Sequence, residues 1–246
     1  MTARDALAAG NLTEALTLAD GTDAAGRLFR VELLALAGRY RDARNELDAI
    51  PEDDPAWPAA RRSFRGLLRA ARRRTRKPAL LTDAPRHLKL RWNASRRTGE
   101  AALIALDRAE EATPHLFGHI DGREFDGLRD ADDRTAGVLE LFVRGDYVWL
   151  PWEHLRRVTL DPARHPLDAA FRPARVRLSD STEFRAHVPL VYAGSHHDDD
   201  FALGLETDFT EVNGLTHGLG AKLLFAGDSE VALGDCTQID VRGATL

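Results

Sequence analysis

Hydrophobic residues in the first half of the chain recur at the spacing of an amphipathic helix. The first stripe occupies positions i, i+3, i+4 and i+7 and consists of Leu12, Ala15, Leu16 and Ala19. Equivalent stripes predict further helices over residues 29–37, 43–50, 64–71, 88–92 and 102–109. Pro51 is expected to end the third of these six helices, while Asp83 and Pro85 are expected to begin the fifth.

A short segment of this helical half occurs twice. Residues 10–15, Gly-Asn-Leu-Thr-Glu-Ala, return 28 residues later as residues 38–43, Gly-Arg-Tyr-Arg-Asp-Ala. A glycine at the bend and an alanine where helices touch are typical of tetratricopeptide-like helical hairpins, and Pro55 falls where such a repeat ends. Because one hairpin cannot cover its own apolar face, we expect the hairpins to stack.

After about residue 118 the pattern changes to short apolar runs separated by polar turns. Residues 139–150 and 176–188 each predict a β-hairpin, and three short strands are expected at 222–225, 230–233 and 237–241. Many short strands with tight turns are typical of a small barrel or sandwich. The predicted fold is therefore α+β, with a tetratricopeptide-like helical domain at residues 1–117 and a small antiparallel β-barrel-like domain at residues 118–246.

The amino-acid composition is that of a folded globular protein, without an intramolecular disulfide or a membrane-spanning segment. Apolar residues make up 43% of the chain and charged residues 30%, which is typical of a folded globular protein. The single cysteine, Cys236, excludes an intramolecular disulfide. The N-terminus carries charges where a secretory signal needs an apolar core, and no stretch approaches the roughly 20 apolar residues of a membrane span. We therefore expect a cytoplasmic protein.

Charge is distributed unevenly along the chain. Residues 1–118 carry a net charge of +5 and residues 119–246 a net charge of −10. The run Arg61–Lys77 contains nine cations and no acid, so it could attract nucleic acid by counterion release. A solvated helix face, or a contact with an acidic partner or with the acidic second half, explains the same run. Nucleic-acid binding through Arg61–Lys77 stays an alternative.

The segment Gly194–Asp200, GSHHDDD, contains residue types that bind zinc, iron or manganese. A metal-dependent hydrolase using His196, His197 and Asp198 is therefore a second alternative. Metal sites usually draw their ligands from distant positions held by rigid elements, and two adjacent histidines of a regular element point in different directions. We accordingly predict a solvated loop and assign no metal ligand.

Other catalytic signals are absent. The chain contains no GxSxG motif, no phosphate-binding loop and no complete dinucleotide-binding glycine motif. The acidic run that begins at Asp130 has Thr135 and Leu141 where a calcium loop needs glycine and glutamate. A paired-carboxylate hydrolase is possible in principle. An Asp–Arg pair and structural capping explain the acidic run better than either alternative. We assign no catalytic residue and no cofactor.

Residues 147–152, YVWLPW, place two tryptophans around a proline. Strand alternation puts Tyr147 and Trp149 on one face and Val148 and Leu150 on the other. One of the two faces is expected to be core, and the sequence does not decide which. An exposed aromatic face could hold an extended peptide.

A longer series of motif residues runs in a fixed order through the second half of the chain: Asp121-Gly122, Asp130, Asp132, Arg134, Glu140, Gly145, Tyr147, Trp149, Asp168, Arg172, Tyr192, Ser195, Asp208, Gly218 and Gly220. The order and spacing of this series resemble the ImpE/SciE/TagJ family of type VI secretion accessory proteins. The helical first half resembles the family as well, so the similarity spans nearly the whole chain. Leu205, Phe209 and Ala221 depart from the family pattern, which puts polar contacts there in doubt.

The resemblance implies a non-enzymatic adaptor. Its expected partner is a helix near the N-terminus of the small subunit of the contractile sheath, and the family is associated with sheath recycling by a hexameric AAA+ ATPase. Either the grooves of stacked helical hairpins or the β-domain could hold such a helix. The residues expected to bind the partner are Tyr147, Trp149, Trp152, Arg134, Arg172 and Asp208.

Overall fold

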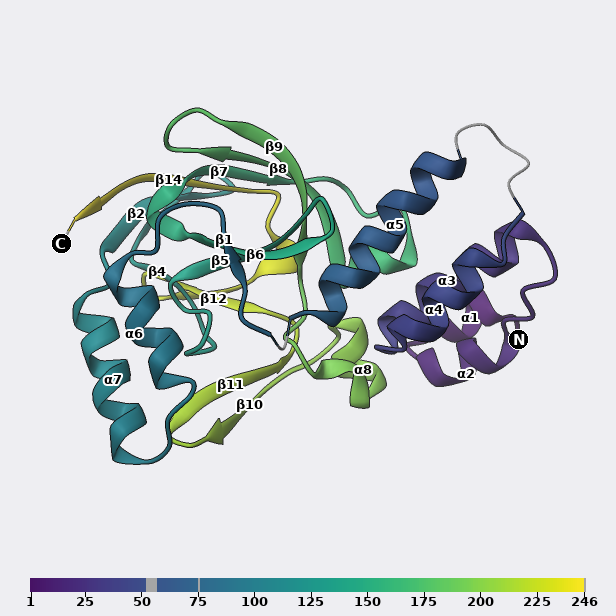
Figure 1. Ribbon diagram of the computed structural model, residues 1–246, viewed down its shortest axis with the longest axis horizontal. Helices are drawn as coiled ribbons and strands as arrows, with labels where there is room; N and C mark the ends of the chain where they lie inside the picture. Colours follow the sequence, from purple (N-terminus) through teal and green to yellow (C-terminus); the bar gives the residue numbers. More distant parts are fainter. Residues whose placement is uncertain (52–56, 75, 246) are drawn as a thin grey trace.

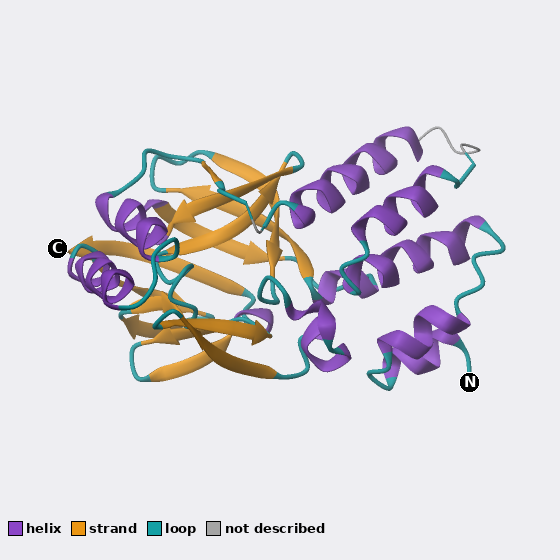
Figure 2. Cartoon of the chain, turned by 60° about the horizontal axis from the view of Figure 1, so that its bottom comes forward, coloured by secondary structure: helices purple, strands orange, loops and turns teal. Residues whose placement is uncertain are grey.

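The computed structural model describes residues 1–51, 57–74 and 76–245, and its architecture is mixed α and β (Figure 1). Helices from the first part of the chain gather at one end of the molecule, and a pair of helices lies at the other end of a large sheet (Figure 2). Pro55, the predicted end of a repeat, lies outside the described residues. No helix within the described ranges is long and apolar enough to cross a membrane.

Two helical hairpins form the N-terminal end. The first pairs α1 (Ala3–Ala8) with α2 (Leu12–Leu18), and the second pairs α3 (Ala24–Leu36) with α4 (Tyr40–Asp48). Gly10 and Gly38 lie in the two turns with φ of +85° and +68°, a backbone conformation that residues with a Cβ rarely adopt. The repeated sequence therefore marks the hairpin turns. That the hairpins are tetratricopeptide-like repeats stays a prediction.

Three further helices follow the two hairpins along the chain. Helix α5 (Trp57–Arg72) buries Leu67, Leu68 and Ala71 in a core that it shares with residues of β5 and β6. Helices α6 (Arg86–Ala94) and α7 (Glu100–Glu111) pair with each other near the far end of the sheet. All six predicted helical stripes lie within or next to helices, so the helical pattern of the first half is confirmed.

The large sheet has nine strands in the order β1-β6-β5-β9-β8-β7-β14-β2-β3. All neighbouring pairs are antiparallel except β1 with β6. Both predicted hairpins are present, as β5–β6 and β8–β9. The bounds are β1 Ala79–Leu80, β2 His115–Ile120, β3 Arg123–Asp126, β5 Val138–Val143, β6 Asp146–Pro151, β7 Leu155–Leu160, β8 Phe171–Leu178, β9 Glu183–Pro189 and β14 Gln238–Thr245.

The predicted barrel is wrong, because the sheet is open. Strands β1 and β3 lie at opposite ends of the strand order and do not pair with each other in the described part of the chain. Closure depends on strand tilt and stagger, which a local pattern does not specify. The remaining strands form a three-stranded sheet and a separate hairpin, made of β4 Leu128–Asp130, β12 Leu223–Ala226, β13 Ser229–Ala232, β10 Thr207–Val212 and β11 Leu215–Gly220.

Strands β5 and β6 are buried on both faces. Val148 and Leu150 belong to a core that also contains residues of β4 and β12. Tyr147 and Trp149 belong to a second core, which they share with helices α1 to α6. Both faces of the aromatic strand are therefore core, which answers the question that alternation alone left open.

Glu32, on the buried side of α3, makes stability depend on pH. Its carboxylate oxygen lies 3.9 Å from His165 Nδ1. Burial, together with the negative charge of Asp168, raises the pKa of Glu32 from 4.5 to about 7, although Arg4 acts in the opposite direction. Because the folded protein holds this proton more tightly than the unfolded chain, the site's contribution to stability falls as pH rises from 4.5 to 7 and then stays constant.

Replacing Glu32 with glutamine is expected to raise the free energy of unfolding at pH 8 by about 2 kcal/mol, because the amide does not ionise. Near pH 4, where the native glutamate is protonated, the change should be small. Urea titrations at the two pH values measure both quantities. Glu14→Gln, on the exposed face of α2, is the matched control, and an equal gain from both variants would contradict the assignment.

Candidate functional site

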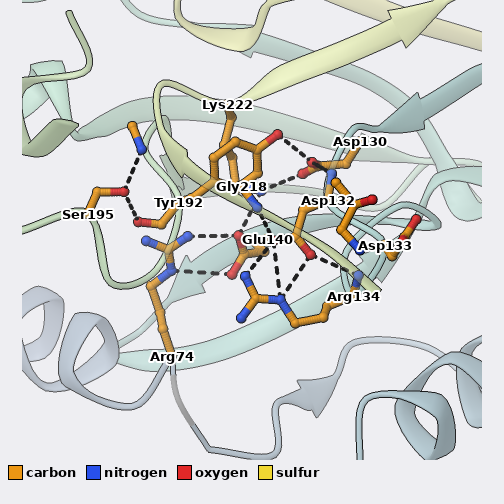
Figure 3. Close-up of polar contacts among 12 residues, drawn as sticks. Arg74, Asp130, Asp132, Asp133, Arg134, Glu140, Tyr192, Ser195, Gly218 and Lys222 are labelled. Atoms are coloured by element: carbon orange, nitrogen blue, oxygen red, sulfur yellow. Dashed lines mark hydrogen bonds and ion pairs between the residues drawn. The ribbon is translucent and has the colours of Figure 1, made fainter. Parts of the chain in front are cut away.

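Glu140, on β5, lies at the centre of a buried ion network (Figure 3). Arg74, just beyond α5, donates to both carboxylate oxygens, from Nε at 3.2 Å and from Nη2 at 2.8 Å. Lys222 Nζ lies 2.9 Å from the same carboxylate. All three side chains are at most 5% exposed. One buried glutamate therefore binds cations from two segments that lie far apart in the sequence.

Lys222 also pairs with Asp130, at the end of β4. The Tyr192 hydroxyl donates to Asp130 Oδ1 at 2.9 Å, and the Lys222 ammonium lies 4.6 Å from the centre of the Tyr192 ring. The network thus joins β4 of the small sheet to β5 of the large sheet through the segment that follows β11.

Asp132 extends the network toward the surface. Its carboxylate accepts from Arg134 Nε at 2.9 Å and from the backbone N–H of Gly218 at 3.0 Å. Asp132 in turn donates its backbone N–H to Asp130 Oδ1 at 2.9 Å. The predicted Asp–Arg pair and structural capping in this acidic run are confirmed.

Two aromatic side chains on β6 complete the contacts of Glu140. The Tyr147 hydroxyl donates to Glu140 Oε1 at 2.6 Å, and Trp149 Nε1 donates to that hydroxyl at 2.6 Å. Trp149 therefore connects the apolar core to the ion network through a relay of two hydrogen bonds.

Contacts within the network shift the pKa values of its side chains and so determine which of them are charged. Burial alone raises the pKa of Glu140, but Arg74 and Lys222 outweigh burial and hold this pKa well below its usual value. Burial lowers the pKa of Lys222, yet Asp130 and Glu140 together raise it above the ordinary value. Burial and Asp130 raise the pKa of the Tyr192 hydroxyl, so that it stays protonated and donates. Such an arrangement suits a rigid scaffold, because its ionised groups already have counter-charges.

A cleft of about 300 Å³ opens beside the network. Its lining includes the cationic side chains of Arg76, Arg96 and Arg134. A groove of about 400 Å³ with mostly apolar walls, including Leu80 and Leu88, lies next to β1 and α6. Both hollows share two residues, Trp92 and Trp149, whose rings meet edge to face with centroids 6.0 Å apart. We refer to the cleft and the groove together as the tryptophan surface.

Comparison with known proteins identifies the family. Residues 122–240 match the family model described as ImpE protein. The chain is 30% identical over 258 aligned residues to the type VI secretion system accessory component TagJ of Pseudomonas aeruginosa, with 98% of this chain and 91% of TagJ covered. The chain belongs to the ImpE family. A crystal structure of a Vibrio parahaemolyticus protein has the same fold, with a TM-score of 0.85, 24% identity and 97% of each chain covered.

Many of the ImpE-family motif residues gather in and around the ion network. Gly218 is one of them, and a Cβ at this position would overlap the ring of Tyr192. Ser195 is another, and its hydroxyl accepts from the backbone N–H of Gly220 at 2.8 Å while it donates to the Tyr192 carbonyl at 2.8 Å. The other motif residues in this region are Asp130, Asp132, Arg134, Glu140, Tyr147 and Trp149.

The six residues expected to bind a partner lie in several places. Tyr147, Trp149 and Arg134 come together in the lining of the cleft. Trp152 is 1% exposed and belongs to the core that also contains residues of β4 and β12. Elsewhere, the Arg172 guanidinium donates to the Asp168 carbonyl at 2.8 Å, and Asp208 is exposed on β10.

The segment Gly194–Asp200 connects the helical hairpins to the rest of the molecule. The segment was predicted to be a loop, and this is wrong in its secondary structure. Residues 195–197 form a 3-10 helix, and α8 (Asp199–Leu203) follows. Asp198 caps α8, and Asp199 accepts from the backbone N–H of Thr13 at 2.8 Å. The His196 ring packs on Gly38, in the second hairpin turn. Among the described residues, no group of three or more His, Cys, Asp or Glu side chains is placed to hold a metal ion.

Arg74 and Lys222 are not among the motif residues, and Glu140 is one of them without an assigned role. Glu140 carried a signal, since it is the one charge in the apolar strand Leu139–Val143. Lys222 is the only lysine after residue 118. Arg74 was hidden within the cationic run, and only the fold distinguishes it from its exposed neighbours.

Proposed function

We propose that this protein is a non-enzymatic accessory component of a type VI secretion system that binds an amphipathic helix of a partner on the tryptophan surface. The observation that carries the proposal is the junction of an apolar groove and a cationic cleft at Trp92 and Trp149. Apolar side chains of a helix would enter the groove, and an acidic side chain one or two turns away would reach Arg96 or Arg134.

The partner we propose is the helix near the N-terminus of the small sheath subunit, with a role in sheath assembly or in ATPase-driven sheath recycling in the cytoplasm. The accessory role is supported by the similarity to TagJ over nearly the whole chain. If the chain divides into parts 1–117 and 118–246, as its sequence predicts, Trp92 belongs to the first part and Trp149 to the second. Binding should then require both parts.

Replacing Trp92 with alanine is expected to weaken binding of the helix at least about tenfold, because tryptophans in the middle of an interface often dominate its energy. A labelled peptide from the N-terminal helix of the same organism's small sheath subunit, titrated into the full-length protein, measures the dissociation constant. Trp92 is only partly buried, so the melting temperature should fall by a few degrees at most.

Leu103→Ala is the control, because it truncates a large apolar residue that is 43% exposed on α7 and does not line the tryptophan surface. Its affinity for the peptide should match that of the unaltered protein. Equal affinities of the Trp92 and Leu103 variants would argue against the proposed site. Absence of binding by the folded, unaltered protein would argue against the proposed partner.

A further inference from the structure

A second groove, of about 760 Å³, lies between α5, the β5–β6 turn and strands β8 and β9. Five arginines line it, and none of the described lining residues carries a carboxylate. We call this feature the arginine groove. Its cations come from three separate elements and are Arg62, Arg65 and Arg69 of α5, Arg144 of the β5–β6 turn and Arg185 of β9.

The walls of the arginine groove are held in a fixed relation. Gly66 of α5 packs directly on Gly145 of the turn, where an added Cβ on Gly145 would lie 2.9 Å from the Gly66 Cα. Arg69 crosses the same contact and donates from Nε to the Gly145 carbonyl at 2.9 Å. The turn and the helix are therefore joined by close backbone contact and by a charged hydrogen bond. The groove is preformed in the folded chain, which lowers the ordering cost of binding.

Three of these arginines, Arg62, Arg69 and Arg144, form no ion pair with a carboxylate within the part of the chain that the structure describes. Arg65 pairs with Asp48 at 2.7 Å, and Arg185 pairs with Asp161 at 2.6 Å. The guanidinium groups of Arg62 and Arg144 form no ion pair within the described ranges, and both residues are exposed. Gathering like charges in one groove costs free energy, and an anionic ligand would remove this cost.

We propose that the arginine groove binds an acidic segment of a partner protein, as a site separate from the tryptophan surface. Arg62 and Arg144 would pair with carboxylates of that segment. Planar guanidinium groups suit this role because they bind carboxylates through two parallel hydrogen bonds.

The charge around the groove favours a short acidic segment over nucleic acid. The rim carries the carboxylates of Asp48 and Asp161, and the adjacent start of β6 carries Asp146. A phosphate chain that continued past the groove would meet these negative charges, and the protein as a whole has a net charge of −5. A segment with a few carboxylates can end within the groove.

The test uses a fluorescently labelled peptide of six glutamates, titrated into the full-length protein at low and at high salt. The expected result is saturable binding with one peptide per protein that weakens as salt increases. The double variant Arg62→Glu/Arg144→Glu should weaken binding at least about tenfold. The control Arg41→Glu/Arg97→Glu makes the same change in net charge at exposed arginines outside the groove and should change affinity by less than about twofold.

Three outcomes would overturn the proposal. These are no saturable binding at low salt, equal weakening by both double variants, and tighter groove-dependent binding of a twelve-nucleotide single-stranded DNA than of the glutamate peptide. The result is independent of the proposed sheath contact. Trp92→Ala should leave binding of the glutamate peptide unchanged, and the groove variant should leave binding of the sheath helix unchanged.

Discussion

Replacing Lys222 with methionine is expected to lower the free energy of unfolding at pH 7 by about 3–5 kcal/mol. The Lys222 side chain is 2% exposed and contacts the carboxylates of Asp130 and Glu140. Methionine has a similar length and no charge, so the variant retains two buried carboxylates without the cation between them. Removal of one partner from a buried ion pair is costly mainly because of the charge that stays behind. Urea titration of the purified protein measures the loss.

The pH dependence of the Lys222 variant provides a second readout. Burial already raises the pKa of Asp130 although Lys222 acts in the opposite direction, so without the ammonium this pKa should rise further above its unfolded value. The loss of stability should therefore grow as pH rises through that range. Lys89→Met makes the same chemical change at an exposed position of α6 and should cost less than about 0.5 kcal/mol. A Lys222 variant as stable as the Lys89 variant at pH 7 would show that the ion pairs of Lys222 contribute nothing to stability.

Local patterns predicted the helices well because helical contacts lie three or four residues apart. The turn glycines Gly10 and Gly38 also carried a clear local signal. The strand order of the open sheet could not be predicted in this way, because it depends on contacts between residues far apart in the sequence. Ala79 and Leu80 pair in parallel with Val148 and Trp149, and no local pattern shows that a segment of the helical half continues the sheet. The division of the chain at residues 117 and 118 stays a prediction.

The candidate site was only partly predictable for the same physical reason. Tyr147, Trp149 and Arg134 were proposed from motifs, and the fold brings them to one cleft. Their environment depends on Arg74 and Lys222, which contact Glu140 across sequence separations of 66 and 82 residues. Composition identifies such residues as charged but does not show whether they are buried. Partner binding by Arg172 and Asp208 stays a prediction.

Replacing Trp149 with alanine is expected to lower the free energy of unfolding by about 3–5 kcal/mol, the usual cost of removing a large aromatic side chain from a core. The side chain is 6% exposed, packs edge to face against Trp92 and donates to the Tyr147 hydroxyl. Alanine would leave a cavity between α6 and β6 and remove a donor from the hydrogen bonds around Glu140. Thermal and urea unfolding of the variant measure this loss.

Trp149→Phe separates the structural role of this residue from a direct role in recognition. Phenylalanine keeps most of the apolar volume and loses the N–H, so we expect a smaller loss of stability, about 1–2 kcal/mol. Because the Trp149 side chain is almost wholly buried, sheath-helix binding by this variant should stay within about threefold of the unaltered protein, in contrast to Trp92→Ala. An unchanged melting temperature together with lost peptide binding in Trp149→Ala would reverse this assignment. Trp149 would then contribute to the recognition surface itself, and Trp92 would be one part of a larger aromatic contact.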